Sequence, residues 1–337
     1  MSKSDKIKTF LAADIGGTKT EIGFFQSGKL GVEELCSKKY KNSDFSSPME
    51  LLDDFMSTSE VDHEIQRAVF GIAAPVFSNK VKLVNIDWSI SKSKIARFLG
   101  TKKVEFYNDL LTTAAGIGCL NEKDILTLQS GKPDKKGNIA VMGVGTGLGE
   151  AMLVRSGKKY VPCATEGGHA DFAPATAAQT GLLLYLKQKF GHVSYERIAS
   201  GRGIKTVYDF ISEHNPPESI SKRFKSEDPS AVIVELAGKG EPGCVEAVRI
   251  VVDVIAAEAG NMALRSLASN GVYIGGGAAY YLRDFLMDER FLSIFVDKGR
   301  YREFLSNVPV KLILDARASL LGAASLAIHG GFKVTSE

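Results

Sequence analysis

The sequence has few of the features that mark special classes of protein. Its four cysteines are scattered through 337 residues without a Cys-x-x-Cys pair, which excludes zinc fingers and thioredoxin-like redox motifs. Dispersed cysteines are typical of the reducing cytosol, where thiols stay free. The longest nearly apolar stretch, 271–282, is glycine-rich and shorter than the roughly 20 residues of a membrane span. Too few apolar residues precede Asp14 for a signal peptide, so we expect a cytoplasmic protein.

A large excess of charge of either sign is also missing. The 42 basic and 39 acidic residues leave a net charge of +3, without the clustered basic face of a nucleic-acid or membrane-binding protein. The short lysine runs at 102–103 and 132–136 are interpreted as solvated loops. An apolar fraction of 44% and a charged fraction of 24% are ordinary for a globular protein. The length predicts about two domains.

Short apolar runs alternate with amphipathic segments along the chain, which favours an α/β fold. Strands are predicted at 9–13, 21–25, 65–72, 104–107, 139–142, 151–154, 272–274 and 310–314. Helices are predicted at 51–56, 91–99, 110–119, 180–190, 195–199, 204–213, 231–238, 244–267 and 320–329. The polar segment 214–229 is interpreted as a surface excursion.

Glycine is abundant, with 34 residues, and it gathers in clusters that follow predicted strands. Glycine lets the backbone approach a phosphate and point N–H groups at it. The clusters fit neither the Walker A motif nor the GxGxxG dinucleotide fingerprint. Each cluster alone is also compatible with a tight hairpin. The three clusters are Gly16-Gly17-Thr18, the run 143–149 containing Gly145-Thr146-Gly147, and Gly275-Gly276-Gly277.

The pattern of strand, glycine turn and strand occurs twice, at 9–25 and again at 139–154. Internal repetition of this kind indicates two related α/β halves, each opening with a glycine hairpin. Two unrelated hairpins with common turn residues would give the same local pattern.

Polar residues beside these turns are candidates for chemistry. Asp14 ends its strand just before a glycine turn, where a carboxylate next to phosphate requires a cation such as magnesium, which usually keeps several waters. Asp14 could instead cap the turn. Asn108 and Asp109 follow a predicted strand at the end where α/β proteins place ligands, although Asp109 could simply cap the next helix.

A third candidate is the stretch Glu166-Gly-Gly-His169. A metal site on a helix needs more ligands than this stretch offers, and two adjacent glycines disfavour a helix. A loop that presents a carboxylate and an imidazole to a polyol fits better. Glu196 alone carries no functional signal.

Together these motifs resemble those of the bacterial glucokinase family, in the superfamily of sugar kinases, actin and heat-shock 70 proteins. The matching stretches follow the family's order and span most of the chain. They are Asp14-Ile-Gly-Gly-Thr18, Tyr107-Asn-Asp109, Gly143-Val-Gly-Thr-Gly-Leu-Gly149, Glu166-Gly-Gly-His-Ala-Asp-Phe172, His192-Val-Ser-Tyr-Glu-Arg197, Ile274-Gly-Gly-Gly277 and Asp297-Lys-Gly-Arg-Tyr301.

The resemblance implies transfer of phosphate from ATP to the 6-hydroxyl of glucose, with Mg²⁺ as cofactor, in a cytoplasmic homodimer. It implies that Asp109 is the general base. The glucose hydroxyls would be bound by Asn108, Glu166, His169 and Glu196. The phosphates would be held by Asp14, through magnesium and water, and by Gly16, Gly17, Thr18, Gly145, Thr146 and Gly147. The adenosine would lie beside Gly275, Gly276 and Gly277.

The same resemblance implies the two-domain, actin-like ATPase (ribonuclease H-like) fold, with a ligand cleft between a small and a large domain. The small domain would comprise 1–119 and 315–337, and the large domain 120–314.

Three other functions stay open on the sequence. A kinase for mannose, for another hexose or for an N-acetylated amino sugar would use the same motifs. A sugar-sensing transcription regulator would need a DNA-binding domain, and only thirteen residues precede Asp14. A non-catalytic, actin-like assembly protein would not need Asn108, Asp109, Glu166 and His169.

Overall fold

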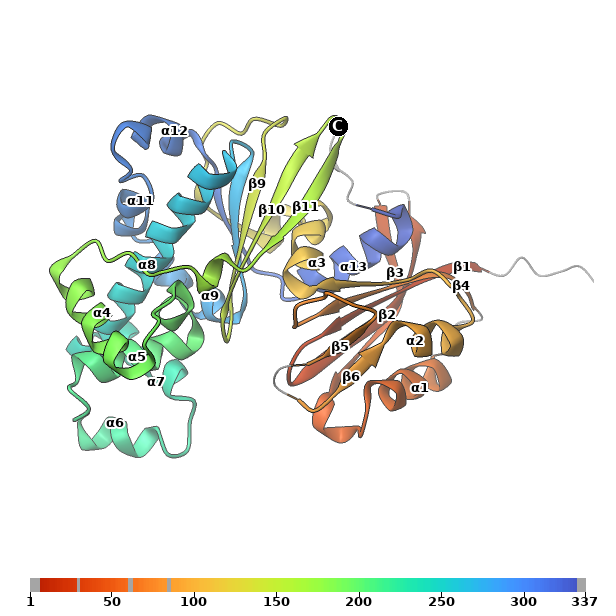
Figure 1. Cartoon of the computed structure of the whole chain (residues 1–337), viewed down its shortest axis with the longest axis horizontal. Coiled ribbons are helices and arrows are strands. Elements are labelled where there is room, and N and C mark those ends of the chain that lie inside the picture. The colour runs from red at the N-terminus through yellow and green to blue at the C-terminus, as the bar shows by residue number, and fades with distance from the viewer. Residues whose placement is uncertain (1–6, 29–30, 60–62, 84–85, 332–337) are drawn as a thin grey trace, which may run out of the picture. The chain divides into compact units, whose positions relative to one another are not determined.

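The computed structural model describes residues 7–28, 31–59, 63–83 and 86–331 (Figure 1). These residues form two compact units. Unit 1 comprises the described residues up to Asn121, together with Arg155–Ala164 and the residues from Arg317 onward. Unit 2 comprises Glu122–Val154 and Thr165–Ala316. The small and large domains at 1–119 plus 315–337 and 120–314 stay predictions, and their residues 1–6 and 332–337 lie outside the described part of the chain.

Unit 1 is built on a mixed five-stranded sheet. The strand order is β3-β2-β1-β4-β7, in which β1 pairs antiparallel with β2 and parallel with β4, and β7 pairs parallel with β4. The strands are β1 (Ile7–Ile15), β2 (Lys19–Gly28), β3 (Gly31–Lys41), β4 (His63–Ile72) and β7 (Val104–Asn108). A two-stranded sheet of β5 (Lys80–Lys82) and β6 (Ser89–Ser91) accompanies it.

Alternation along β1 separates the hydrophobic core of unit 1 from its polar residues. Leu11, Ala13 and Ile15 point to one face, where they join a buried cluster with Leu51 and Phe55 of α1 (Pro48–Thr58). Because successive side chains of a strand point to opposite faces, Asp14 lies on the other face. That face is covered by α3 (Asp109–Gly116) and α13 (Ala318–His329), while α2 (Lys92–Leu99) packs with α1 (Figure 1).

A second, six-stranded sheet repeats the plan of the first, and it belongs to unit 2 except for its residues within Arg155–Ala164, which are part of unit 1. Its order is β11-β10-β9-β12-β13-β8, in which β9 pairs antiparallel with β10 and parallel with β12, and β13 pairs parallel with β12. The strands are β8 (Ile125–Gln129), β9 (Ile139–Val144), β10 (Leu148–Ser156), β11 (Lys159–Thr165), β12 (Gly271–Gly275) and β13 (Val310–Ile313). The predicted internal repeat is therefore confirmed, with β8 as an added edge strand.

The helical layer of unit 2 centres on one long helix, α8 (Pro242–Ser266), which is buried along most of its length. It packs with α5 (Gly201–Ile211), α7 (Pro229–Gly238) and α4 (Ala177–Phe190) in one continuous apolar core. Caps fix where these helices begin, since Ser200 accepts from the N–H of Gly203 and Glu241 from that of Cys244. Shorter helices follow at α9 (Gly277–Tyr281), α10 (Arg283–Leu286), α11 (Glu289–Phe295) and α12 (Arg302–Asn307).

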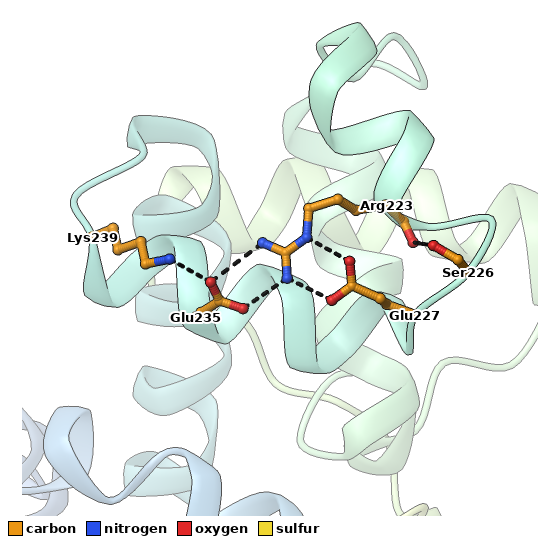
Figure 2. A network of polar contacts seen from close by, with 5 residues as sticks. All are labelled: Arg223, Ser226, Glu227, Glu235 and Lys239. Carbon is orange, nitrogen blue, oxygen red and sulfur yellow. Dashed lines mark hydrogen bonds and ion pairs between the residues drawn. The ribbon is translucent and has the colours of Figure 1, made fainter.

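The segment 214–243, predicted to be a surface excursion over 214–229, contains the additional helix α6 (Glu218–Arg223). A polar network ties α6 to α7 (Figure 2). The Arg223 guanidinium donates to Glu227 and to Glu235, at 2.6 Å and 2.7 Å from Nη2. Lys239 makes a further ion pair with Glu235. Charged pairs thus replace the apolar pattern on which the prediction of a helix depends.

Other differences from the predicted elements have local reasons. The predicted helix 195–199 is only a 3-10 turn, Tyr195–Arg197, because Ser200 caps a new helix directly after it. The strand β3 was not predicted, since its largely polar sequence lacks an apolar run. No helix within the described ranges has the length and apolarity needed to cross a membrane.

Candidate active site

Three parallel strands of unit 1 end at one edge of the sheet and bring two predicted site stretches together. Ile15 of β1 lies opposite Ile72 of β4, which lies opposite Asn108 of β7. Asp14 and Asp109 therefore lie at the carboxyl ends of β1 and β7, the two strands that flank β4, at the edge where open α/β sheets bind ligands.

Asp14 is partly buried on the helix-covered face of the sheet. Its Oδ1 accepts a hydrogen bond of 2.6 Å from the Ser319 hydroxyl of α13. Burial raises the pKa of Asp14 to about 6, and the Ser319 hydrogen bond lowers it in part. The alternative that Asp14 merely caps its own turn is not what the contacts show, because its partner comes from a distant helix.

Asp109 is the first residue of α3, and Asn108 caps that helix. The N–H of Leu110 donates to Oδ1 of Asn108 at 3.0 Å and to Oδ1 of Asp109 at 2.9 Å. Burial, followed by the negative charge of Asp14, raises the pKa of Asp109 to about 7. The capping role considered from the sequence is therefore present, and it coexists with a carboxyl group whose pKa suits proton transfer near neutral pH.

The first glycine turn, Gly16-Gly17-Thr18, connects β1 to β2. The N–H of Gly16 donates to the carbonyl of Lys19 at 2.9 Å. Asn42, which is 1% exposed, donates from Nδ2 to the Gly16 carbonyl and accepts from the Thr20 hydroxyl. A buried amide thus holds the turn rigid, which the sequence analysis did not foresee.

The second glycine turn, at Gly145-Thr146-Gly147, connects β9 to β10 in unit 2. Oε2 of Glu196 accepts from the N–H of Leu148 at 3.0 Å, and a Cβ at Gly147 would lie 2.3 Å from that same oxygen. The Gly145 carbonyl accepts from the N–H of Gly201, at the start of α5, at 2.8 Å. Glu196 therefore contacts the glycine turn directly.

The third glycine cluster lies against the second. Gly276 has φ +101°, which favours glycine, and a Cβ there would lie 2.4 Å from the carbonyl oxygen of Val144. Val144 is the residue directly before Gly145. Gly277 begins α9, and a Cβ at Gly277 would meet open space. Gly275, the last residue of β12, is buried.

His169 ends a 3-10 turn, Gly167–His169, and Glu166 directly precedes it, so the predicted loop takes the form of a short turn. The Ala170 carbonyl accepts from the N–H of Tyr195, so this turn lies beside the turn that carries Glu196. Glu166 and His169 are both exposed. Unit 2 thus brings together the three predicted sugar-binding residues that lie outside unit 1.

The buried carboxylate of Glu150, which is paired with that of Glu258, lies directly against this turn. Glu150 is 4% exposed, and a Cβ at Gly167 would lie 2.1 Å from its Oε2. Glu258 is fully buried, and it accepts from Asn261 at 2.9 Å and from Arg265 at 2.5 Å. Burial, followed by the charge of Glu258, raises the pKa of Glu150, while Arg265 opposes the shift.

The predicted site residues thus form one group in each unit. Unit 1 holds Asp14, Gly16, Gly17, Thr18, Asn108 and Asp109, and unit 2 holds Gly145, Thr146, Gly147, Glu166, His169, Glu196, Gly275, Gly276 and Gly277. Within the described ranges no three His, Cys, Asp or Glu residues gather into a metal cage.

The structural comparisons define the class of protein. The chain superposes on the glucokinase of an Antarctic psychrotroph with a TM-score of 0.83 and 28% identity, covering 96% of this chain and 99% of the other. A ROK-family glucokinase from Streptomyces griseus, in complex with glucose and AMPPNP, gives 0.60 and 22%, with 95% and 99% covered. The fold is α/β of the actin-like ATPase type, as predicted, and the class is that of the sugar kinases.

The sequence comparisons narrow the class to one family. The glucokinase family model matches residues 11–329. The glucokinase of Nostoc sp. is 35% identical over 335 residues, covering 94% of this chain and 98% of that protein. The glucokinase of Photorhabdus laumondii is 32% identical, with 94% and 95% covered. The chain belongs to the glucokinase family, and the resemblance stated from its motifs is confirmed.

The sequence analysis does not identify four buried polar residues that support these two groups of site residues. Asn42, Thr112, Glu150 and Ser319 are buried polar residues whose partners lie far away in the chain. A local motif marks none of them, because polar residues within apolar helices and strands have no periodic signature.

Proposed function

We propose that the protein catalyses the ATP-dependent phosphorylation of glucose at its 6-hydroxyl, giving glucose 6-phosphate and ADP. Asp109 supports this proposal most directly, as a partly buried carboxyl group with a pKa raised to about 7 in a member of the glucokinase family. A base with this pKa is substantially ionised near neutral pH and still basic enough to accept a proton.

Asp109 is assigned as the general base. The 6-hydroxyl oxygen attacks the γ-phosphorus, its proton passes to the Asp109 carboxylate, and the bond between the γ-phosphorus and the ADP oxygen breaks. Phosphoryl transfer depends mainly on positioning and neutralisation of charge. The hydrogen bonds from Leu110 to Asn108 and Asp109 fix the carboxylate at the start of α3.

Asp14 is assigned as the magnesium-binding residue, acting through water. Its partly buried carboxylate acts on Asp109, and the pKa values of both groups are raised first by burial, a cost to the charged form that a bound divalent cation would offset. Carboxylate oxygens are the hard ligands that Mg²⁺ takes. When bound with ATP, magnesium neutralises charge on the phosphate oxygens.

The remaining residues are assigned to binding. We place the phosphates on the turns Gly16-Gly17-Thr18 and Gly145-Thr146-Gly147, and the adenosine beside Gly275, Gly276 and Gly277. The glucose hydroxyls are assigned to Asn108, Glu166, His169 and Glu196. Charged acceptors form stronger hydrogen bonds than neutral ones, which suits carboxylates to a polyol. Oδ1 of Asn108 accepts from Leu110, and its Nδ2 donates to the Ala74 carbonyl at 3.4 Å, so the second hydrogen on Nδ2 is the one left to donate to the sugar.

A coupled assay of sugar 6-phosphate formation tests the proposal. It uses ATP and Mg²⁺ with glucose, mannose, fructose and N-acetylglucosamine. Glucose turnover that collapses in Asp109→Asn, but not in the matched surface variant Asp53→Asn, supports both reaction and base. Turnover with another sugar alone would move the substrate to another hexose. Absence of turnover in folded, ATP-binding protein would contradict the kinase assignment, and ADP and polyphosphate would then be tried as donors.

The predicted homodimer, the cytoplasmic location and a place in glycolysis belong to this proposal too. Sedimentation equilibrium of the purified protein tests the dimer, and a monomer across the micromolar range would exclude it. Fractionation of cells that express the chain tests the location.

A further inference from the structure

Two buried hydroxyl groups, those of Ser319 and Thr112, lie between the Asp14 carboxylate and the backbone carbonyl of Asp109. The Ser319 hydroxyl of α13 donates to Oδ1 of Asp14 at 2.6 Å. The Thr112 hydroxyl of α3 lies 2.8 Å from the Ser319 oxygen and 2.8 Å from the carbonyl oxygen of Asp109. A chain of short polar contacts therefore runs from Asp14 to the first residue of α3.

The surrounding backbone leaves space for this hydroxyl pair. Thr112 is 0% exposed and Ser319 is 7% exposed. A Cβ at Gly71 of β4 would lie 2.5 Å from the Thr112 hydroxyl oxygen and 3.0 Å from that of Ser319. A Cβ at Gly322 would lie 1.7 Å from the Thr112 carbonyl oxygen. Glycines on the sheet and on α13 thus allow α3, α13 and β4 to meet at the two hydroxyls.

The number of hydrogens on the Thr112 and Ser319 hydroxyls determines which of the two donates to the other. Each hydroxyl has a single hydrogen, and an ionised Asp14 only accepts, so Ser319 donates to Asp14. The Asp109 carbonyl has a second donor, the Thr113 hydroxyl at 2.9 Å. Thr112 is therefore able to donate to Ser319, which leaves every member of the chain from Thr112 to Asp14 with a partner. A buried network that is fully satisfied in this way is rigid.

We propose that Ser319, supported by Thr112, is a positioning residue that holds the Asp14 carboxylate in the orientation that receives the nucleotide-bound magnesium. The inference rests on the proposed function, in which Asp14 binds that ion. Ser319 touches neither substrate nor ion, and it acts through Asp14 alone. A carboxylate at the end of β1 would otherwise rotate about its side-chain torsions, and the short bond from Ser319 selects one rotamer.

Ser319→Ala tests the inference, and Ser325→Ala is the matched control. Ser325 is also 7% exposed and lies on the same helix, so its loss removes an equal volume and a hydroxyl without touching Asp14. The readout is binding of Mn²⁺ in the presence of ADP, followed by electron paramagnetic resonance without turnover. We expect the Mn²⁺ dissociation constant to rise about tenfold in Ser319→Ala, as for loss of a hydrogen bond to a charged group, and to stay unchanged in Ser325→Ala.

Steady-state kinetics provide the second readout. Ser319→Ala is expected to raise the Mg²⁺ concentration required for half-maximal rate about tenfold and to leave the KM for glucose unchanged. If Ser319 had a purely structural role, Ser319→Ala would change both the Mg²⁺ requirement and the KM for glucose, or Ser325→Ala would change the Mg²⁺ requirement by the same amount. Either result would overturn the inference. So would wild-type Mn²⁺ binding in folded Ser319→Ala.

Thr112→Val covers the case in which Ser319→Ala does not fold. It keeps the shape of Thr112 and removes only the hydroxyl that supports Ser319. A weakened Mn²⁺ affinity supports the inference, and an unchanged one contradicts it. These outcomes can be distinguished from a failure of the proposed function. Asp109→Asn tests the general base through turnover, whereas Ser319→Ala and Thr112→Val are measured by metal binding.

Discussion

Each unit of the molecule withdraws a pair of acidic residues from solvent, fully for Glu150 and Glu258 in unit 2 and partly for Asp14 and Asp109 in unit 1, and the two pairs have different partners. In unit 2, Glu150 and Glu258 share Arg265, and Glu258 also accepts from Asn261. In unit 1, no Lys or Arg of the described residues forms an ion pair with Asp14 or Asp109, and their carboxylates accept from the Ser319 hydroxyl and from the N–H of Leu110.

The difference separates a structural role from a binding role. A buried carboxylate is costly unless a cation compensates it. In unit 2 that cation is the guanidinium of Arg265, so the charge of Glu150 and Glu258 is compensated within the protein. Among the residues that the structure describes, the pair in unit 1 has no such partner, and under the proposed function its cation would be the magnesium that accompanies the nucleotide. Four predictions test this contrast between the acidic pairs of the two units.

The largest expected effect is on the base of unit 1. Asp109→Asn keeps the size of the side chain and its acceptor for Leu110 but cannot take a proton. We expect kcat/KM for glucose to fall by about 10²- to 10⁴-fold, the usual contribution of a positioned base. In the wild type, the acidic limb of the pH profile of kcat/KM is expected near pH 7, and it should be lost from the residual activity of the variant.

Asp53→Asn, on the exposed face of α1, is the control and should keep wild-type kinetics. A residual activity of Asp109→Asn within a few-fold of the wild type, in protein that binds glucose, would remove Asp109 from the mechanism.

The second prediction removes the cation of unit 2. Arg265→Met leaves Glu150 and Glu258 buried without their positive partner. We expect the free energy of unfolding in urea to fall by about 2–4 kcal/mol, somewhat less than for a fully buried pair, because the Arg265 side chain is 45% exposed. The double variant with Glu258→Gln should recover part of the loss. If Arg265→Met alone left stability unchanged, the pair would not need its cation, and the contrast with unit 1 would disappear.

The third prediction concerns the pH dependence of stability. Because the pKa of Asp109 is about 7 in the folded protein and 3.8 in its ordinary state, the folded protein binds the extra proton between these values. The contribution of Asp109 to stability is therefore complete below about pH 4 and is lost as the pH rises through 7. We expect the free energy of unfolding to fall by about 1–3 kcal/mol more in the wild type than in Asp109→Asn between pH 5 and pH 8.

Urea denaturation of the two proteins, without magnesium or nucleotide, provides this measurement. Parallel pH dependences would mean that the Asp109 carboxyl group is not perturbed by burial and by Asp14. The same variant is thus expected to be less active and, at pH 8, more stable.

The smallest effect is expected outside both acidic pairs. Arg223→Gln breaks the network between α6 and α7, whose members are solvent-accessible (Figure 2). Pairs of this kind contribute little and are screened by salt. We expect a slight fall in melting temperature that vanishes at high salt, and unchanged kinetics with glucose and ATP. A large loss of activity would assign the segment 214–243 a role in the reaction.

Much of the fold was accessible from the sequence, because its signals are local. The apolar run of β1 ends at Asp14 and is followed by glycine, and the same pattern returns at β9. These repeats predicted two glycine hairpins, and the structure places each in a sheet of the same strand order. The polar strand β3 and the helix α6 are not predicted, since β3 is held by hairpin pairing with β2 and α6 by ion pairs of Arg223, and neither segment has an apolar periodicity.

The sequence by itself determined the alternation of strands and helices, the glycine turns and the order of the motifs that mark the family. Tertiary structure alone decided the environment of the carboxyl groups. Ser319 lies 305 residues from Asp14, and only the packing of α13 on the sheet brings them within 2.6 Å. The raised pKa values of Asp14 and Asp109 likewise come first from burial, and then from the charge of Glu21 on Asp14 and of Asp14 on Asp109. Backbone preferences act between neighbours in sequence, whereas desolvation and hydrogen bonding act between neighbours in space.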